Sequence, residues 1–455
     1  MCPATPLLAL AALLPVPQAF SAATTVELPA TGSGDADHAT VAINADGDIL
    51  VAWSTRRPDL PDNAFQVEAC LLPYLGGGRW ARPAELELLL LGDPMAGVFG
   101  AAAESCRKPD VQAVGHDFFV VWPRSSADRS SCRLELVRVR VLGGTAEVDA
   151  PQPGRGYLVD GTLDADSAGA MPDLVESPLL PQGVAVVYAD DELQAPPLRE
   201  FDLRVAVADF ASLPPVLHGP FLLVDDLPCD DGLRGGEPAG GKVLPDVVLD
   251  DMGNLVVAWE EYARAGHGGA ASDRGSIQVR WFSDPVLDVP QPLATLRLGG
   301  RAVSDRPRRP NLASSRLDAD DTVALAYMSA ADGSSLADVN WCSLARDGAL
   351  GSSLDLGYPC TGPVTEALPV PVQGASLQAC LAIASEAGQV RLQGFPRGRG
   401  LQTLPTVPQP WRPAADLLEP GPADLGGRTV IPISYEAPSP TAGALRIFLV
   451  IRLAP

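Results

Sequence analysis

One motif recurs along the chain: a polar turn followed by an apolar run that ends in an aromatic residue. The clearest copies are NADGDILVAWS (44–54), GHDFFVVWPRS (115–125), DMGNLVVAWEE (251–261) and DADDTVALAYM (318–328). The aromatic residue falls at Trp53, Trp122, Tyr188, Trp259, Tyr327 and Tyr435, and QACLAIASE (378–386) is a further copy with Ala384 in its place. Such self-similarity is the signature of a repeat architecture, and it predicts seven units of about 50–70 residues.

Each unit contains short strands on both sides of this run. Downstream, RLELVRVRV (133–141) and SIQVRWF (276–282) alternate with the period of two that is typical of a strand. A last apolar piece, such as FLLVDD (221–226), closes the unit. Upstream, most copies have a proline before a short apolar stretch: Pro109-Asp110-Val111, Pro172-Asp173-Leu174, Pro245-Asp246-Val247, Pro310-Asn311-Leu312, Pro369-Val370 and, more loosely, Pro413-Ala414-Ala415-Asp416. The unit is therefore four strands, A to D.

Seven such units predict an all-β fold, a seven-bladed β-propeller of four-stranded antiparallel blades. The 44 Gly and 45 Pro residues are dispersed between the apolar runs, as turns require. The polar turns ADGD, DMGN and DADD are expected to be A–B hairpin turns, with calcium ligation as the alternative. The last unit lacks a fourth strand, and residues 24–30 (TTVELPA) precede the first unit. We therefore expect the N-terminal strand to close the ring and cover a sheet edge.

The charge of the chain limits its partners. Acidic residues number 56 and basic residues 33, a formal net charge of −23. A field of that sign repels phosphate, so we expect neither nucleic acid nor an anionic membrane surface as a partner. The excess of acidic side chains favours solubility outside the cell, and cation binding is the alternative use.

Residues 1–23 resemble a secretory signal peptide. Residues 7–16 (LLALAALLPV) form an apolar core that is too short to span a bilayer, and Ser21-Ala22-Ala23 fits a cleavage site. The segment departs from the usual pattern because no Lys or Arg precedes the core. We expect residues 24–455 to form a single propeller domain that is secreted or periplasmic, without membrane insertion.

Seven cysteines follow this segment, and none are spaced as CxxC, so neither a zinc site nor a redox motif is indicated. In an oxidising compartment, disulfides are the expected use of cysteine. Cys106 precedes strand A of the second unit and Cys132 opens its strand C, which makes Cys106–Cys132 the preferred disulfide. The odd number leaves at least one thiol outside such pairs.

Two copies of the repeat, VAINADGDILVAWS and VVLDDMGNLVVAWEE, resemble the blades of secreted bacterial propellers of the sialidase-like and BNR-like kind. The chain has no SxDxGxTW Asp-box and no Arg-Ile-Pro signature near its amino terminus, so an arginine triad of the sialidase kind cannot be placed. The resemblance implies the fold, and the fold by itself does not determine a function.

Common catalytic signatures are absent from the sequence: there is no HExxH, GxSxG or GxxxxGK[ST] motif, and the four histidines are scattered. We therefore assign no catalytic residue, no metal site and no cofactor, although calcium is considered. The long segments 226–242 and 262–276 are expected to form loops on the face where strand A begins, and long loops are often functional.

The candidate binding residues are those that begin the inner strands on that face: Asp110, Asp173, Asp246, Asn311 and Asp416. A ring of carboxylates at the mouth of a central channel would favour a cation or raise carboxyl pKa values. The alternative is structural, with each aspartate accepting hydrogen bonds from backbone amides of a neighbouring blade.

Two functions follow from these observations. The absence of catalytic motifs favours a non-enzymatic binding or scaffold protein that holds a glycan, a peptide or an envelope protein on its loop-rich face. The alternative is a glycoside hydrolase or lyase acting on a polysaccharide with paired carboxylates in the central funnel. Asp173, Asp246 and Glu261 are the candidates for such a pair.

Overall fold

The structure is a computed structural model, and it describes residues 19–454 apart from a set of short segments. These segments are 23, 32–33, 61–63, 83–86, 98–102, 129–130, 164–170, 193–199, 229–244, 262–275, 284–289, 300–305, 315–321, 331–336, 346–349, 356–367, 374–377, 384–392, 396–410 and 440–443. The described residues form β-strands and one short 3-10 helix, η3 (Ala423–Leu425). None of the described helical residues forms a helix with the length and apolarity needed to cross a membrane.

The first three blades are consecutive antiparallel sheets. Blade 1 consists of β3 (Ala36–Ile43), β4 (Ile49–Arg56), β5 (Phe65–Leu72) and β8 (Leu88–Gly92). Blade 2 consists of β10 (Asp110–Val114), β11 (Asp117–Ser125), β12 (Cys132–Leu142) and β13 (Thr145–Asp149), with β9 (Ser105–Cys106) added on β11 and β14 (Tyr157–Leu163) on β12. Blade 3 consists of β15 (Asp173–Glu176), β16 (Gly183–Glu192), β17 (Glu200–Asp209) and β18 (Val216–Pro228).

The remaining sheets follow in chain order. Blade 4 consists of β19 (Asp246–Leu249), β20 (Leu255–Glu261), β21 (Ser276–Phe282) and β22 (Pro292–Gly299). Blade 5 consists of β23 (Arg306–Ser314), β24 (Thr322–Ala330), β25 (Ala337–Ala345) and β26 (Leu350–Asp355). A three-stranded sheet follows, with β27 (Leu368–Gln373), β28 (Gln378–Ile383) and β29 (Gln393–Phe395). The closing blade consists of β30 (Trp411–Ala415), β31 (Thr429–Pro438), β32 (Leu445–Ala454) and β2 (Thr25–Glu27). A small separate sheet joins β1 (Ala19–Ser21), β7 (Arg79–Ala81) and β6 (Tyr74–Gly76).

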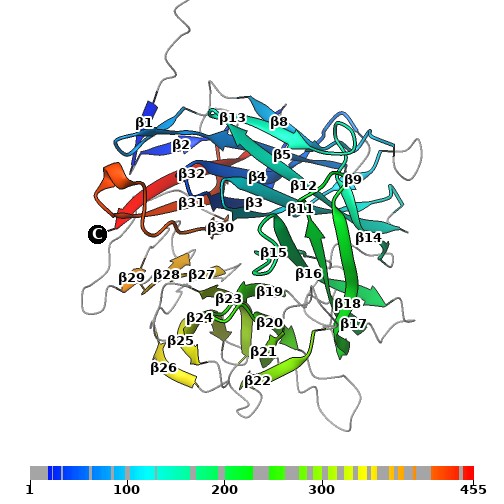
Figure 1. The fold of residues 1–455 in the computed structure, drawn as a ribbon, viewed down its shortest axis with the longest axis vertical. Helices are drawn as coiled ribbons and strands as arrows, with labels where there is room; N and C mark the ends of the chain where they lie inside the picture. Colours follow the sequence, from blue (N-terminus) through cyan, green and yellow to red (C-terminus); the bar gives the residue numbers. More distant parts are fainter. Residues whose placement is uncertain are drawn as a thin grey trace, which may run out of the picture.

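The blades are arranged in a propeller-like ring, with the first strand of each blade around the centre (Figure 1). These inner strands contact one another in cyclic order, from β3 through β10, β15, β19, β23, β27 and β30 and back to β3. Six of the sheets contain four or more strands each. The predicted all-β, propeller-like fold is therefore confirmed.

The recurring aromatic residue lies in the second strand of its blade and packs between blades. Trp53, Trp122, Tyr188 and Trp259 are all fully buried. Trp259 belongs to a cluster that combines residues of blades 3 and 4, and Trp122 to a cluster that combines blades 1 and 2. Because both faces of each sheet are covered, runs such as LVVAW are apolar on both sides of the strand. The repeat thus marks the packing between blades.

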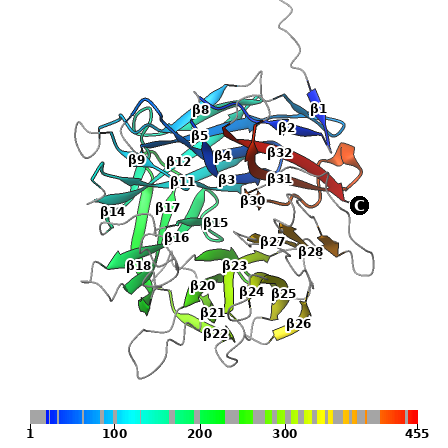
Figure 2. The ribbon, with the colours of Figure 1, turned by 180° about the vertical axis from the view of Figure 1, so that it is seen from behind.

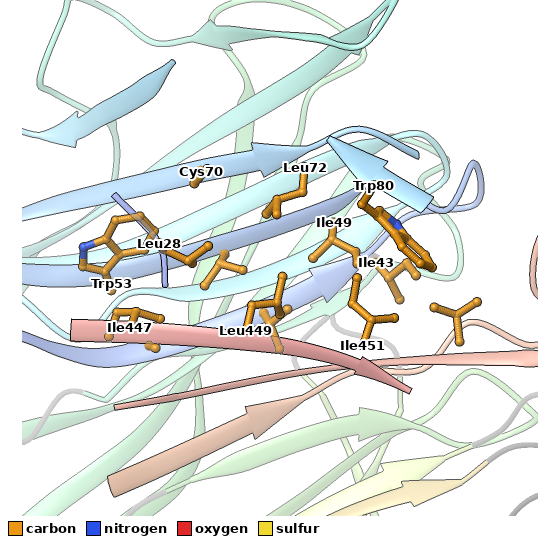
Figure 3. Packing of buried hydrophobic residues seen from close by; sticks show 14 of the residues in the cluster. Leu28, Ile43, Ile49, Trp53, Cys70, Leu72, Trp80, Ile447, Leu449 and Ile451 are labelled. Atoms are coloured by element: carbon orange, nitrogen blue, oxygen red, sulfur yellow. The ribbon is translucent and has the colours of Figure 1, made fainter. Parts of the chain in front are cut away.

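The N-terminal strand completes the closing blade, as the sequence predicts. Strand β2 pairs antiparallel with β32, with Thr25 opposite Val450, and the two strands lie side by side in both views (Figures 1 and 2). Leu28 then enters the cluster between the closing blade and blade 1, near Trp53, Ile447 and Leu449 (Figure 3). The two ends of the chain therefore join the ring.

The tight A–B turns in blades 1 and 4 are side-chain-capped hairpins. The Asn44 side-chain oxygen accepts hydrogen bonds from the backbone N–H groups of Asp46 and Asp48, and Gly47 has a φ of 86°. In blade 4, Asp250 accepts from Met252 and Asn254 in the same way. Glycine is needed at the left-handed position of such turns. The predicted turn role of ADGD and DMGN is confirmed, whereas DADD (318–321) lies outside the described residues.

The predicted Cys106–Cys132 disulfide is wrong. Cys106 lies on β9 opposite Arg124 of β11, and Cys132 lies on β12 opposite Ser125 of β11, so that β11 separates them. Two strands on either side of a third are about 9.5 Å apart, beyond the reach of a disulfide. Their side chains also enter different clusters, Cys106 between blades 1 and 2 and Cys132 between blades 2 and 3. No disulfide joins Cys70, Cys106, Cys132 or Cys342, the cysteines that the structure describes.

Some predicted features fall on segments outside the described residues. Most of the predicted signal peptide does so, since the description begins at residue 19 and omits residue 23. The long segments 229–244 and 262–275, which contain most of the two expected loops, are also outside.

Candidate functional site

A cavity of about 360 Å³ lies among the inner strands of the ring. Its wall is formed by β3, β10, β15, β19 and β23 and by the end of β30. All five predicted site residues line it: Asp110, Asp173, Asp246, Asn311 and Asp416. The structure therefore brings to one cavity residues that are spread over more than three hundred positions of the sequence.

Alternation along each inner strand explains why these side chains face the cavity. In β19, Val247 and Leu249 are buried between blades, whereas Asp246 and Val248 are partly exposed. Successive side chains of a strand point to opposite sides. A polar residue at the first position and an apolar residue at the second therefore direct the carboxyl group to the axis and the apolar group into the core.

Three of the five residues begin an inner strand, as predicted, and two do not. β10, β15 and β19 start at Asp110, Asp173 and Asp246. Asn311 lies inside β23, after a bulge between Arg308 and Asn311. Asp416 follows β30 directly. Asp416 accepts a hydrogen bond from Ile43, three residues after Thr40, whereas Asp110 accepts from Leu174, one residue after Asp173, so the Asp416 carboxyl group lies further along the inner strands.

Each of the four aspartates ties its blade to the next one. One carboxyl oxygen of Asp110 accepts a hydrogen bond from the Leu174 N–H at 2.8 Å, and Asp173 accepts from Val247 at 2.6 Å. Asp246 accepts from the Leu312 N–H, and Asp416 accepts from the Ile43 N–H at 2.8 Å across the closure of the ring. The structural alternative from the sequence is therefore confirmed. Each aspartate uses one of its carboxyl oxygens for this contact between blades.

The carboxyl groups of three of these aspartates also form a row with the Thr40 hydroxyl group, across blades 1 to 4. The Thr40 hydroxyl donates to Asp110 at 3.0 Å. Asp110 is hydrogen-bonded to Asp173, and Asp173 to Asp246, through their carboxyl groups. We call Thr40, Asp110, Asp173 and Asp246 the carboxyl row. Thr40 was not identified from the sequence because Ala39 replaces the proline that marks this position in other units.

Burial and mutual repulsion determine where protons reside in the carboxyl row. Burial, and then the charge of Asp173, raise the pKa of Asp110 well above its usual value. Burial and the charge of Asp246 do the same for the pKa of Asp173. Burial also raises the pKa of Asp246, but hydrogen bonds from Asp173 and from the Leu312 N–H oppose that rise. Asp246 is thus the acceptor at the end of the row and the member that holds negative charge most readily.

Asp416 faces the same cavity from the closing blade. Burial raises its pKa to about 6, against the lowering effect of hydrogen bonds from the Ile43 and Leu417 N–H groups. The charge of Asp110 also raises the pKa of Asp416, so the two groups interact through the cavity. A carboxyl group with a pKa near 6 carries a proton over much of the mildly acidic range, which is the requirement for a general acid.

The described residues give no support to a metal centre here. Among them, no group of three or more His, Cys, Asp or Glu side chains is arranged to hold a metal ion. No Lys or Arg is among the described residues that line the cavity. Of the third predicted acid, Glu261, the structure describes only the backbone at the end of β20. The described cavity wall offers carboxyl groups, which can donate or accept protons.

Comparisons with known proteins concern the fold. No protein-family model and no curated protein matches the chain. Among solved structures, it is similar to a protein of unknown function from Dyadobacter fermentans, with 11% identity, coverage of 96% of this chain and 99% of that chain, and a TM-score of 0.49. It is also similar to a GH93 α-L-arabinofuranosidase of Fusarium graminearum (12% identity, 86% and 99% coverage, TM-score 0.44). A Hadza microbial sialidase is a third (9% identity, 92% and 66% coverage, TM-score 0.45).

These comparisons bear on two expectations from the sequence. The resemblance to sialidase-like propellers is confirmed at the level of the fold, which the ring of blades itself displays. The expectation of a non-enzymatic binding or scaffold protein is contradicted, because the similar structures with a named activity are an arabinofuranosidase, an arabinanase and sialidases. Short sequence motifs do not test for such a site, because carboxyl groups that the ring brings together need no contiguous motif.

Proposed function

We propose that the protein is a glycoside hydrolase whose active site is the central cavity. The observation that carries this proposal is that Asp416 of the closing blade and Asp246 of blade 4 line the same cavity. These blades are not neighbours in the cyclic order of inner strands. Glycosidases use two carboxyl groups that flank the scissile bond, one protonated and one ionised.

Asp416 takes the role of the general acid in this proposal. Its pKa of about 6 leaves it protonated in mildly acidic solution. Its two oxygens accept from the Leu417 N–H at 2.7 Å and the Ile43 N–H at 2.8 Å, which hold the group in one orientation. The proton passes from this carboxyl group to the glycosidic oxygen as the bond to the anomeric carbon breaks.

Asp246 takes the role of the second carboxylate. The hydrogen bond from Asp173 stabilises its charge, and Asp110 and Asp173 behind it retain protons. The ionised group activates a water molecule or attacks the anomeric carbon, depending on whether the enzyme inverts or retains configuration. Asp110, Asp173 and Asn311 then offer hydrogen-bonding groups for sugar hydroxyls, so a glycan is the proposed partner.

The test is a panel of glycosides and polysaccharides incubated with the mature protein at pH 5 and pH 8. The panel includes 4-nitrophenyl α-L-arabinofuranoside, 4-nitrophenyl β-D-galactopyranoside, sialyllactose and arabinan. We expect cleavage of at least one compound, with faster turnover at pH 5 because Asp416 must be protonated. Loss of a general acid or base typically costs 10²–10⁴-fold in rate, so Asp416→Asn and Asp246→Asn should each lose about that factor.

Asparagine keeps an oxygen for the contact between blades, which separates loss of chemistry from loss of folding. Asp59→Asn is the matched control, because Asp59 is exposed and paired with Arg57 away from the cavity. Its turnover should equal that of the wild type. Failure to cleave any compound, or full activity in both cavity variants, would contradict the proposal.

We also propose two features of the whole chain. The three-stranded sheet β27–β29 is the sixth of seven blades, because β27 contacts both β23 and β30 in the cyclic order of inner strands. Residues 1–23 direct export to the periplasm or the medium, as their apolar core and small residues suggest.

A further inference from the structure

A glutamine on the cavity wall has no polar equivalent in the three blades that follow it. Gln112 lies on β10, two residues after Asp110, and lines the cavity. The same position of β15, β19 and β23 is occupied by Val175, Val248 and Ala313, which also line the cavity. An inner strand can therefore pack in the ring with an apolar residue at this position, so packing does not explain the glutamine.

Alternation along β10 directs Gln112 toward the axis. Val111 is buried in the cluster between blades 1 and 2, whereas Asp110 and Gln112 on either side of it are partly exposed. Successive side chains of a strand point to opposite sides, so Gln112 is on the same side as Asp110. Both side chains therefore face the cavity that they line.

The amide group of Gln112 presents an oxygen that the described protein does not use. The side-chain nitrogen donates to the Ala113 carbonyl at 2.9 Å. Because only the nitrogen can donate to a carbonyl, this contact identifies the other terminal atom as the acceptor Oε1. Oε1 has no hydrogen-bond partner among the described residues, and it is not one of their buried polar atoms that lack a partner. This oxygen is therefore accessible, on a side chain that lines the cavity.

Contacts at both ends of β3 and β10 show that these two inner strands run in the same direction. At their starts, the Thr40 hydroxyl donates to Asp110 at 3.0 Å. Just beyond their other ends, the Asn44 side chain donates to the His116 carbonyl at 2.9 Å. Positions that are equally far from the Thr40–Asp110 contact therefore lie at a similar depth in the cavity.

Gln112 and the carboxyl group of Asp416 both lie beyond the carboxyl row. Asp416 accepts from the N–H of Ile43, which is three residues after Thr40 on β3. Gln112 is two residues after Asp110 on β10. Since each residue advances a strand by about 3.3 Å, Gln112 is about 7 Å beyond the row, close to the depth of the Asp416 carboxyl group. One ligand in the cavity can therefore contact both side chains.

We propose that Gln112 is a specificity-determining residue, whose Oε1 accepts a hydrogen bond from a hydroxyl group of the sugar on which Asp416 acts. This inference rests on the proposed glycosidase function. A site that pairs a polar group with a substrate hydroxyl discriminates against the analogue without that hydroxyl, because the polar group is then left unpaired. Gln112 should therefore select one particular hydroxyl position of the substrate.

The first test compares the wild type with Gln112→Met, which keeps the length of the side chain but removes Oε1. The substrates are the panel compound that the wild type cleaves fastest and the set of its monodeoxy analogues. For one analogue, we expect the wild type to lose about tenfold or more in kcat/KM, and Gln112→Met to show less than threefold discrimination. Discrimination against the other analogues should be the same in both proteins, which a merely structural role of Gln112 would not produce.

A second variant guards against misfolding. Gln112→Val introduces the residue that blades 3 and 4 have at this position, Val175 and Val248, so it should unfold at the wild-type denaturant midpoint. It should lose the same discrimination as Gln112→Met. The matched control is Gln152→Met, because Gln152 is exposed between β13 and β14 and does not line the cavity. This control should discriminate among the analogues as the wild type does.

A binding measurement is independent of turnover. Calorimetric titration of the Asp416→Asn protein with the same compound gives a Kd, which should rise about tenfold when Gln112→Met is added. An active wild type, with unchanged discrimination in Gln112→Met and Gln112→Val and an unchanged Kd, would overturn this inference alone. A wild type that cleaves no compound would overturn the proposed function and this inference together.

Discussion

At the scale of single residues, blade 2 contains a charged group buried without access to water. Arg124 is fully buried and lies 2.8 Å from Glu104 and 2.9 Å from Glu135, both of which are also buried. It also donates to the backbone oxygens of Asp93 and Gly154. One guanidinium therefore connects β11, β12 and two neighbouring loops. Such groups are costly to bury, and their stability depends on every partner being present.

Replacing Arg124 by methionine should strongly destabilise the protein. The change leaves two buried carboxylates facing one another without the guanidinium, and loss of one partner of a buried ion pair costs about 3–5 kcal/mol. Urea denaturation of Arg124→Met measures this loss. The control is Arg140→Met in the same blade, where Arg140 is 32% exposed beside Glu147 and Asp149 and the expected cost is about 1 kcal/mol or less. Equal costs in the two variants would contradict this account.

At the scale of elements, β2 joins the two ends of the chain. The strand is short, yet Leu28 directly after it is buried in the cluster between blade 1 and the closing blade. The Leu28 N–H donates to the Ile447 carbonyl at 2.8 Å, which extends the pairing of β2 with β32. Because this strand comes from the opposite end of the chain, the closing blade and blade 1 can separate only when the strand detaches.

Leu28→Ala should measure the contribution of this closure. Truncation of a buried leucine costs about 2–5 kcal/mol, from lost burial and from the cavity left behind. The free energy of unfolding from urea titration should fall by that amount. Leu90→Ala is the matched control, since Leu90 lies on β8, the outer strand of blade 1, and is 44% exposed. An unchanged free energy in Leu28→Ala would show that the N-terminal strand contributes nothing to closing the ring.

At the scale of the whole molecule, four carboxyl groups link consecutive blades around one axis. In the folded protein their pKa values are raised, chiefly by burial. Between the ordinary carboxyl pKa and the folded pKa, the folded state binds more protons than the unfolded state. The free energy of unfolding must therefore fall as pH rises through that interval. The ring should be most stable in mildly acidic solution.

Asp416 makes this dependence measurable. For Asp416 this interval runs from the ordinary carboxyl pKa of 3.8 to the folded-state pKa of about 6. At 1.36 kcal/mol per pKa unit, ionisation of Asp416 lowers the free energy of unfolding by about 3 kcal/mol. Between pH 4 and pH 7.5, the wild type should lose about that much more stability than Asp416→Asn in urea titrations. Asp59→Asn, at an exposed site, should follow the wild type. Identical pH profiles for the wild type and Asp416→Asn would contradict the assignment of this pKa.

The sequence by itself determined the repeat, the strands of most units, the hairpin turns of blades 1 and 4 and the closing role of residues 24–30. These are local properties, because a period of two, an apolar run or an Asp-Gly turn acts within a few residues. The same local pattern placed Asp110, Asp173 and Asp246 at the starts of inner strands, with carboxyl groups toward the axis.

Only the tertiary structure decided how those residues meet. The ring brings Asp416 of the closing blade to the cavity that Asp246 lines, and the spacing between blades makes a hydrogen-bonded row of carboxyl groups that sequence distance does not encode. Strand order explains the failed disulfide, since β11 separates Cys106 from Cys132. The N–H of His38, whose φ is 53°, likewise donates to Glu436, 398 residues away. Protonation and hydrogen bonding at the axis are therefore products of contacts between blades, which appear only when the ring is closed.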